Sequence, residues 1–136
     1  MHRILGGYAE PLWAVLRVVA SFFFACHGAQ KLFGVFGGVS GQGDTVPLLS
    51  QLGLAGLIEL VGGTLVAVGL LGSSAAFLAS GEMAVAYFTA HQPRGLLPIQ
   101  NGGELAALYA FLFLYVAARG SGRWSLANAL GRPDLA

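Results

Sequence analysis

The sequence predicts an all-α integral membrane protein, a four-helix bundle that forms one domain over residues 1–136. Composition is the first reason, because hydrophobic residues make up 56% of the chain and charged residues only 10%. A soluble domain carries about 25% charged residues. Periodic spacing of long apolar stretches is the second reason. A helix needs about 20 mostly apolar residues to cross a bilayer, since lipid offers no partner to free backbone groups.

Four stretches meet this length, and Gly-, Pro- and Ser-rich turns separate them. The expected helices cover about residues 12–33, 52–71, 73–91 and 102–119. The Gly-rich segment 34–51 has few charges for its length, which is typical of a re-entrant loop or a cover over the mouth of the bundle. A tight turn is expected at Gly72-Ser73-Ser74, with a serine as helix N-cap. Pro93 and Pro98 bracket the last connection.

An even number of spans places both termini on one side of the membrane. Four basic residues lie on that side, and they are Arg3, Arg119, Arg123 and Arg132. The other side has Arg94 and Lys31. The positive-inside rule therefore predicts an N-in, C-in, multi-pass topology. Because Glu10 and Pro11 interrupt the N-terminal region, the first apolar run is expected to be a retained helix and not a signal peptide.

Several chemistries are excluded by simple counts. The net charge is +1, which predicts no nucleic-acid partner. Cys26 is the single cysteine, so the chain cannot form an intramolecular disulfide or a Cys-x-x-Cys redox pair. The ionisable residues include no i, i+3 or i, i+4 ligand pair of the Glu-x-x-His kind, so we predict no metal site.

Ionisable residues inside the expected spans are the strongest functional signal. A charge near the bilayer centre costs several kcal/mol, and such residues mark functional sites by default. The set comprises Arg17, His27, Lys31, Glu59, Glu82 and Glu104, with His91 at the end of the third helix. Two basic residues face three acidic ones in a low dielectric, so either one glutamate stays protonated or a histidine takes up a proton.

Helical spacing predicts that most of these groups meet. Arg17, Ser21, Phe24, Gly28 and Lys31 share one face of the first helix. Gly56, Glu59 and Gly63 share a face of the second helix, as do Ala79, Glu82 and Ala86 on the third and Glu104, Leu108, Phe111 and Tyr115 on the fourth. By depth, the histidines, Lys31 and the three glutamates gather in the outer half of the bundle, with Arg17 deeper.

Each of these residues also has a purely structural interpretation. Asn101 and Glu104 have the spacing of a capping box, and Lys31 could extend to the outer headgroups. His27 could hydrogen-bond between helices, and His91 could be interfacial. Arg17 and Glu82 could form a structural salt bridge.

Short motifs in chain order resemble the DoxX family. His27-Gly28-Ala29-Gln30-Lys31 resembles its His-Gly-x-x-Lys motif, and Glu59-Leu60-Val61-Gly62-Gly63 resembles its second-helix motif. Gly81-Glu82-Met83-Ala84, Asn101-Gly102-Gly103-Glu104 and the ending Gly120 to Leu126 are similar to later segments. Ala127 departs from the pattern, since members often carry aspartate there. The resemblance implies a four-helix protein of the bacterial inner membrane that acts as an oxidoreductase subunit.

The first functional hypothesis is a quinone-binding redox subunit. His27 or Lys31 would contact a quinone carbonyl, while Glu59 and Glu82 would carry protons. Arg17, Phe24, Glu104, Tyr115 and His91 are the expected cofactor-binding residues, with Phe24, Phe111 and Tyr115 walling the slot. Electrons would come from a redox partner protein or a soluble substrate. Membrane lipids and a second copy of the chain are further expected partners.

Two alternatives stay open at this stage. A non-enzymatic membrane scaffold would use the same charges as a network that fixes the bundle and recruits partners. A proton or small-solute pathway would need water to reach Glu82.

Overall fold

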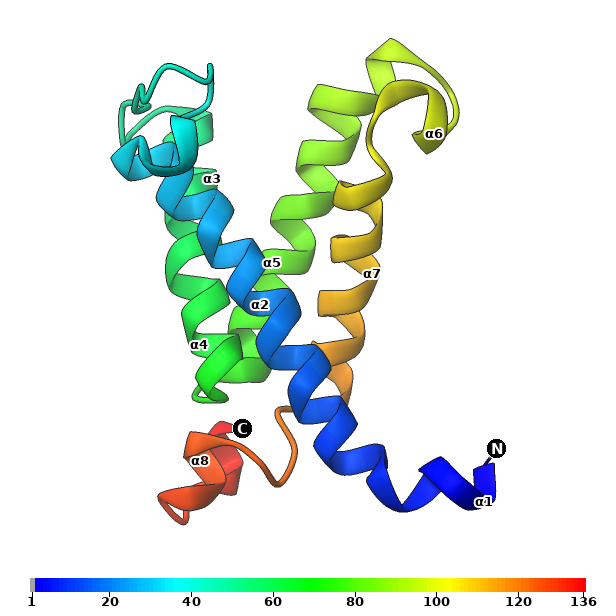
Figure 1. Cartoon of the computed structure of the whole chain (residues 1–136). Helices are drawn as coiled ribbons and strands as arrows, with labels where there is room; N and C mark the ends of the chain where they lie inside the picture. The colour runs from blue at the N-terminus through cyan, green and yellow to red at the C-terminus, as the bar shows by residue number, and fades with distance from the viewer. Residues whose placement is uncertain (1) are drawn as a thin grey trace.

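The computed structural model describes residues 2–136, and the side chain of Arg3, counted above for topology, lies outside the described part. The described chain is all-helical and contains no strand (Figure 1). Four long rods dominate it: α2 (Ala9–Phe33), α3–η3–α4 (Gln51–Leu57, Ile58–Gly62, Gly63–Val68), α5–η4 (Gly72–Ala86, Tyr87–His91) and α7 (Glu104–Arg119). The short elements are α1 (His2–Leu5), η1 (Gly6–Tyr8), η2 (Val35–Gly37), η5 (Gln92–Arg94), α6 (Pro98–Asn101), α8 (Leu126–Ala129) and η6 (Pro133–Leu135).

The four rods follow the expected ranges closely, but the turn after the second rod lies earlier than predicted. Gly69 adopts a left-handed conformation with φ of 71°, and its N–H donates to the carbonyl of Leu65 at 2.9 Å. Leu71, also left-handed at φ 53°, then precedes α5 directly. The predicted serine N-cap is therefore wrong, because the glycine ends the helix before the serines are reached.

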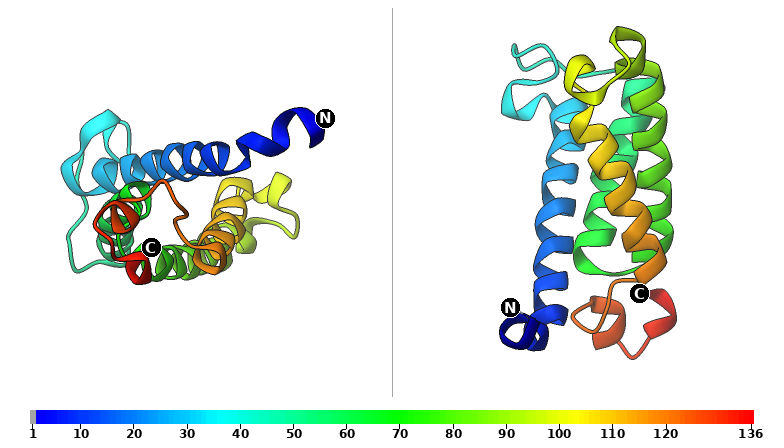
Figure 2. Two further views of the ribbon diagram at one scale, coloured as in Figure 1. Left: turned by 90° about the horizontal axis from the view of Figure 1, so that it is seen from below. Right: turned by 90° about the vertical axis from the view of Figure 1, so that its right-hand side faces the viewer.

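The rods associate as two pairs. The rod α2 packs along α3, η3 and α4, while α5 packs along α7, and η3 and α4 join the pairs through α5. The view from below in Figure 2 shows α2 on one side and α5 with α7 on the other. The loops 34–50 and 92–103 share one end of the bundle, and both termini share the opposite end (Figure 1).

Glycines allow the close approach of α2 to the second rod. A methyl group on Gly28 would lie 2.5 Å from the carbonyl oxygen of Gly56, and one on Gly63 would lie 2.8 Å from that of Ser21. Both distances are shorter than any real contact. The predicted faces around Gly28 and Gly56 are thus confirmed as helix-packing faces of small residues.

The variant Gly28→Ala tests this packing. We expect it to lower the free energy of unfolding by about 1–3 kcal/mol, because the methyl group would push against backbone atoms that cannot move aside. Thermal unfolding in detergent measures the effect. Gly81→Ala is the matched control, since Gly81 lies in the same kind of helix but its added methyl would meet open space. Equal melting temperatures for the two variants would contradict the packing role.

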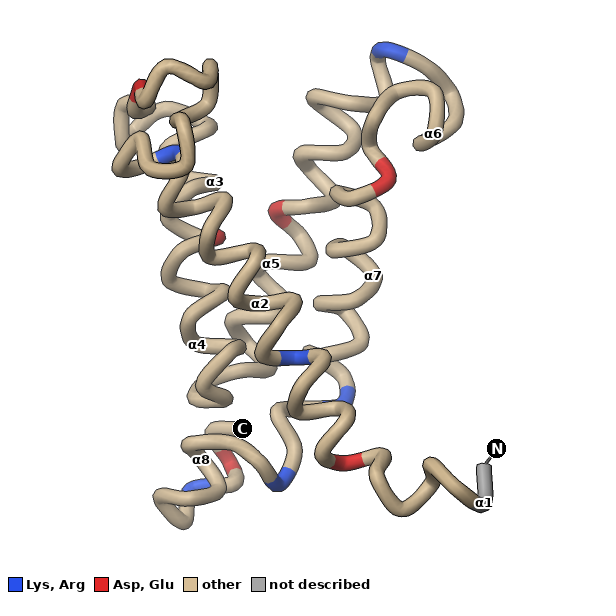
Figure 3. Tube along the Cα trace, in the orientation of Figure 1, with Lys and Arg blue, Asp and Glu red and all other residues tan. Residues whose placement is uncertain are grey.

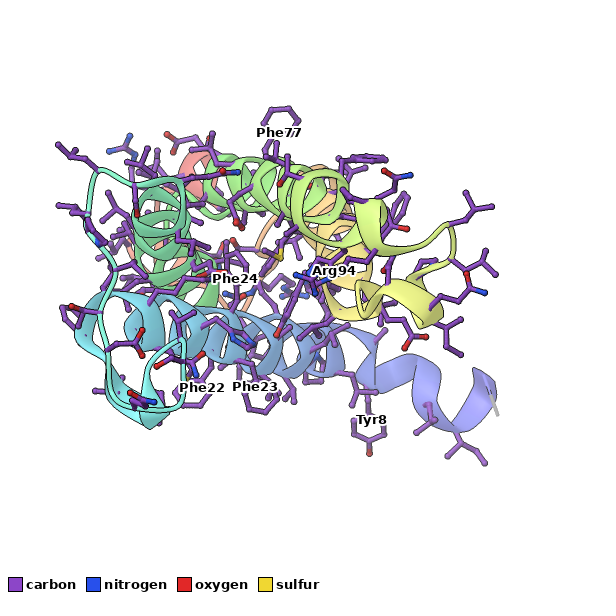
Figure 4. The ribbon with its side chains drawn as sticks, turned by 90° about the horizontal axis from the view of Figure 1, so that it is seen from above. Tyr8, Phe22, Phe23, Phe24, Phe77 and Arg94 are labelled. Carbon is purple, nitrogen blue, oxygen red and sulfur yellow. The ribbon has the colours of Figure 1, made fainter. Side chains whose placement is uncertain are left out.

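Aromatic contacts close the centre of the bundle. Phe24 on α2 is fully buried and its ring lies 5.4 Å from that of Tyr109 and 4.6 Å from that of Phe113, both on α7. The view from above in Figure 4 shows Phe24 between the helices, whereas Phe22 and Phe77 point away from them. The predicted position of Phe24 inside the bundle is confirmed.

The fourth rod presents a different face from the one predicted. Leu108, Phe111 and Tyr115 are 68%, 75% and 54% exposed, and Glu104 is exposed as well. Its buried residues are Ala106, Tyr109, Phe113 and Val116. The expectation that Phe111 and Tyr115 wall an interior slot is wrong. Hydropathy cannot choose between two apolar faces, and small residues decide here: Ser80 of α5 donates to the carbonyl of Ala110 at 2.7 Å.

Candidate functional site

A buried ion pair joins the first two rods. Lys31 lies in the last turn of α2, and its Nζ donates to both carboxylate oxygens of Glu59 in η3. The Glu59 side chain is 2% exposed and that of Lys31 is 19% exposed. A buried charge of either sign is costly alone, so each group compensates the other. Lys31 therefore points to Glu59 inside the bundle and does not extend outward, as the alternative of a lipid-headgroup contact would require.

Glu59 also occupies an unusual stretch of backbone. The segment η3 (Ile58–Gly62) is a π-helical turn inside an otherwise α-helical rod, and η4 (Tyr87–His91) is a second one in the third rod. Such turns are rare and often occur at functional sites. Both lie in the half of the bundle that carries the ion pair.

Glu82 lies next to this pair on α5. Its side chain is half-buried, and its Oε2 is buried without a hydrogen-bond partner. The carboxyl group of Glu82 lies within electrostatic range of both Glu59 and Lys31. Lys31, Glu59 and Glu82 come from three rods and are named here the carboxylate–lysine cluster.

Two further polar groups border the carboxylate–lysine cluster. His27 lies one turn before Lys31, is exposed, and lies within electrostatic range of Glu59. Tyr109 is also within electrostatic range of Glu59, and its hydroxyl donates to the carbonyl of Ala20 at 3.4 Å. The structure thus brings His27 to the rim of the cluster.

His91 and Glu104 lie apart from the cluster, in and after the connection between the third and fourth rods. His91 Nδ1 lies 3.4 Å from the backbone carbonyl of Asn101, and the side-chain amide of Asn101 donates to the carbonyl of Gly95 at 2.9 Å. The predicted capping box does not form, because Gly102 is left-handed at φ 70° and separates Asn101 from α7. Glu104 consequently stands exposed in the first turn of α7, outside the gathering predicted for it.

Arg17 performs a structural task at the other end of the bundle. Its side chain is 1% exposed and donates to the carbonyls of Val66, Ala67 (2.6 Å) and Trp124 (2.7 Å). Two of these carbonyls lie at the end of α4 and the third belongs to the C-terminal segment. The structural salt bridge between Arg17 and Glu82 is wrong, because the guanidinium is already engaged elsewhere.

The C-terminal segment is held against the same end. Ala127 N–H donates to the carbonyl of Gly69 at 3.1 Å, and Leu71 N–H donates to that of Leu135 at 2.6 Å. Figure 2 shows this segment beneath the rods. Arg119 completes the end by pairing with Glu10 at 2.6 Å and lying 4.5 Å over the ring of Trp13. The sequence pattern did not single out the Glu10–Arg119 pair.

The loop 34–50 covers the end of α2 beside Lys31. Val46 N–H donates to the carbonyl of Lys31 at 3.0 Å, and the Gln30 amide donates to that of Gly38 at 3.0 Å. Asp44 orders the loop by accepting hydrogen bonds from the hydroxyl and backbone N–H of Ser40, which hold the pKa of this carboxyl below its usual value.

Opposite this loop, Arg94 is seen over the space between the helix pairs in Figure 4.

Charge divides between the ends of the bundle. Figure 3 shows blue and red segments near the termini and a second group, with more red than blue, in the opposite half. Within the described residues, no three His, Cys, Asp or Glu side chains are placed to hold a metal ion.

Comparisons with known proteins agree with the resemblance. The DoxX family model matches residues 12–92, which carry the first three rods and all three members of the cluster. An uncharacterized protein of Haemophilus influenzae (strain Rd) is 43% identical over 128 residues, covering 89% of this chain and 92% of the relative. No solved structure matches the chain significantly. DoxX proteins are membrane proteins, and two rods here, Gly6–Phe33 and Gln51–Val68, are long and apolar enough to cross a bilayer. The chain belongs to the DoxX family.

Proposed function

We propose that the protein is a quinone-binding subunit of a membrane oxidoreductase, with its head-group site at the carboxylate–lysine cluster. The unpartnered carboxyl oxygen of Glu82 carries this proposal. A buried polar atom without a partner costs free energy, and a ligand that supplies a hydrogen bond would remove that cost. A quinone or quinol head group can supply one, since its oxygens accept or donate according to redox state.

The topology that goes with this proposal is four spans with both termini in the cytoplasm of a bacterial cell. The rod 72–91 has 20 residues, which corresponds to about 30 Å of helix, and large apolar side chains cover the outside of all four rods. Arg119, Arg123 and Arg132 share one end, as the positive-inside rule requires. The cluster then lies in the outer half of the membrane.

The reaction needs two electrons and two protons to convert a quinone into a quinol. In this proposal Glu82 and Lys31 would deliver protons to the two oxygens, and His27 would connect them to water. Electrons must come from a redox partner protein or a soluble reductant, because the sequence carries no flavin, haem or iron–sulfur motif. This chain would therefore bind the quinone and supply its protons, while a partner supplies the electrons.

A membrane scaffold is the second candidate, and the Lys31–Glu59 pair favours it. That pair already satisfies both charges, as a network with a purely structural role would. The scaffold account assigns Glu82 to helix packing, so it expects no ligand between the rods.

The variant Glu82→Gln separates the two candidates. We expect about a tenfold loss of quinone binding with a small change in melting temperature, since leaving a buried polar atom of the ligand without its partner costs about 1–3 kcal/mol. Binding of decyl-benzoquinone to protein in lipid nanodiscs, measured by isothermal titration calorimetry, tests this. Glu104→Gln is the control, because Glu104 is exposed and lies apart from the cluster. Unchanged binding in Glu82→Gln together with a lower melting temperature would favour the scaffold.

A further inference from the structure

An apolar groove runs along the outside of the bundle between the second and third rods. It has a volume of about 390 Å³. Its walls are Leu57, Ile58, Val61, Gly62 and Leu65 on one side and Leu71, Ser74, Ala75 and Leu78 on the other. From Leu57 to Leu65 the groove extends about 12 Å along the helix, at 1.5 Å per residue.

The groove points toward the carboxylate–lysine cluster. Ala75 and Leu78, which line it, precede Glu82 by seven and four residues, spacings that place all three on one side of α5. Ile58, on the opposite wall, is adjacent to Glu59 in η3. Glu82 therefore stands one helical turn beyond Leu78, the last groove residue on this rod.

From this continuity we infer that the groove holds the apolar tail of the molecule whose head group meets Glu82, namely a lipid-soluble quinone with a linear tail. This inference rests on the proposed function and adds to it a route of entry: the ligand arrives from the bilayer between the second and third rods. A free phospholipid chain could also lie in an apolar groove, but its head group would stay at the membrane surface and leave Glu82 without a partner. The unpartnered carboxyl group of Glu82, one helical turn beyond the groove, is what favours the quinone.

Gly62 offers a way to fill the groove without disturbing the fold. A methyl group at this position would lie 3.8 Å from the carbonyl of Ala75 and 3.9 Å from Ile58 Cγ2, which are ordinary contacts. Its backbone is helical, with φ of −61°, so a larger residue causes no backbone strain. The variant Gly62→Leu would place a side chain where the tail is expected.

The experiment compares decyl-benzoquinone with the same ring lacking the decyl tail, in nanodiscs of fixed lipid composition. Each ligand is compared between variant and wild type, so partitioning into the bilayer cancels. We expect Gly62→Leu to weaken binding of the tailed quinone about tenfold, equivalent to losing about two buried methylene groups, and to leave the tailless ring unchanged. Gly81→Leu should alter neither, because Gly81 is exposed and lies outside the groove.

The other outcomes are equally decisive. Full retention of tailed-quinone binding in Gly62→Leu would contradict the inference that the groove holds the tail. Loss of binding in Glu82→Gln would still support the proposed function. If neither ligand binds to the wild type, both the tail site and the proposed function are contradicted. A decyl-benzoquinone with a terminal diazirine gives a check that needs no variant: cross-links to Leu65 or Leu71 support the groove, and cross-links confined to α7 contradict it.

Discussion

Replacing Lys31 with methionine should destabilise the protein more than any other single substitution in the cluster. The change leaves Glu59, which is 2% exposed, without its partner inside the bundle. Removing one member of a buried ion pair costs about 3 kcal/mol or more. Denaturant unfolding of the protein in detergent micelles measures the loss.

The double variant Lys31→Met with Glu59→Met provides the control. Replacing both charges with apolar groups of similar size is often nearly neutral, so we expect the double variant to recover most of the lost stability. A double variant at least as unstable as the single one would show that the two residues do not act as a pair.

The second large effect is expected for Arg17→Met. The Arg17 guanidinium donates to two carbonyls at the end of α4 and joins the C-terminal segment to them through the carbonyl of Trp124. Losing hydrogen bonds to a charged donor costs about 3 kcal/mol, and the segment from Arg123 onward should come loose. Limited proteolysis of vesicles that expose this end should then cleave the segment faster than in the wild type.

Arg17→Lys sharpens the experiment. An ammonium keeps the charge but lacks the planar fork that reaches three separate carbonyls, so rescue should be partial at most. Unchanged proteolysis in both variants would contradict the role assigned to Arg17, and the Glu82→Gln variant should leave cleavage at wild-type rates because Glu82 lies in the other half of the bundle.

Helix positions and the inward faces of the first three rods were predictable from the sequence. The spacing of Arg17, Phe24 and Gly28 sets a face by itself, and glycines at 56 and 63 mark where a neighbour can approach. The grouping of Lys31, Glu59 and Glu82 in one half of the bundle followed from the depth of each residue along its helix and from the helix face that it occupies. In each case the signal was the contrast between polar or small residues and apolar ones.

Where that contrast is missing, the prediction failed. Nearly every residue of α7 is apolar or aromatic, so hydropathy does not distinguish its buried face from its exposed face, and Tyr115 was placed inward when it is exposed. The partners of Arg17 were equally hidden, because they are backbone carbonyls, which every residue carries. The early end of α4 depended on the conformation of Gly69, one glycine among many in the chain.

Infrared difference spectroscopy of the protein in nanodiscs, recorded on adding decyl-benzoquinone, addresses the central claim most directly. If a ligand head group bonds to the buried carboxyl group of Glu82, the carboxyl C=O stretching region must change on binding, and the change must disappear in Glu82→Gln but persist in Glu104→Gln. A spectrum without that change, or with the same change in Glu82→Gln, would contradict the account.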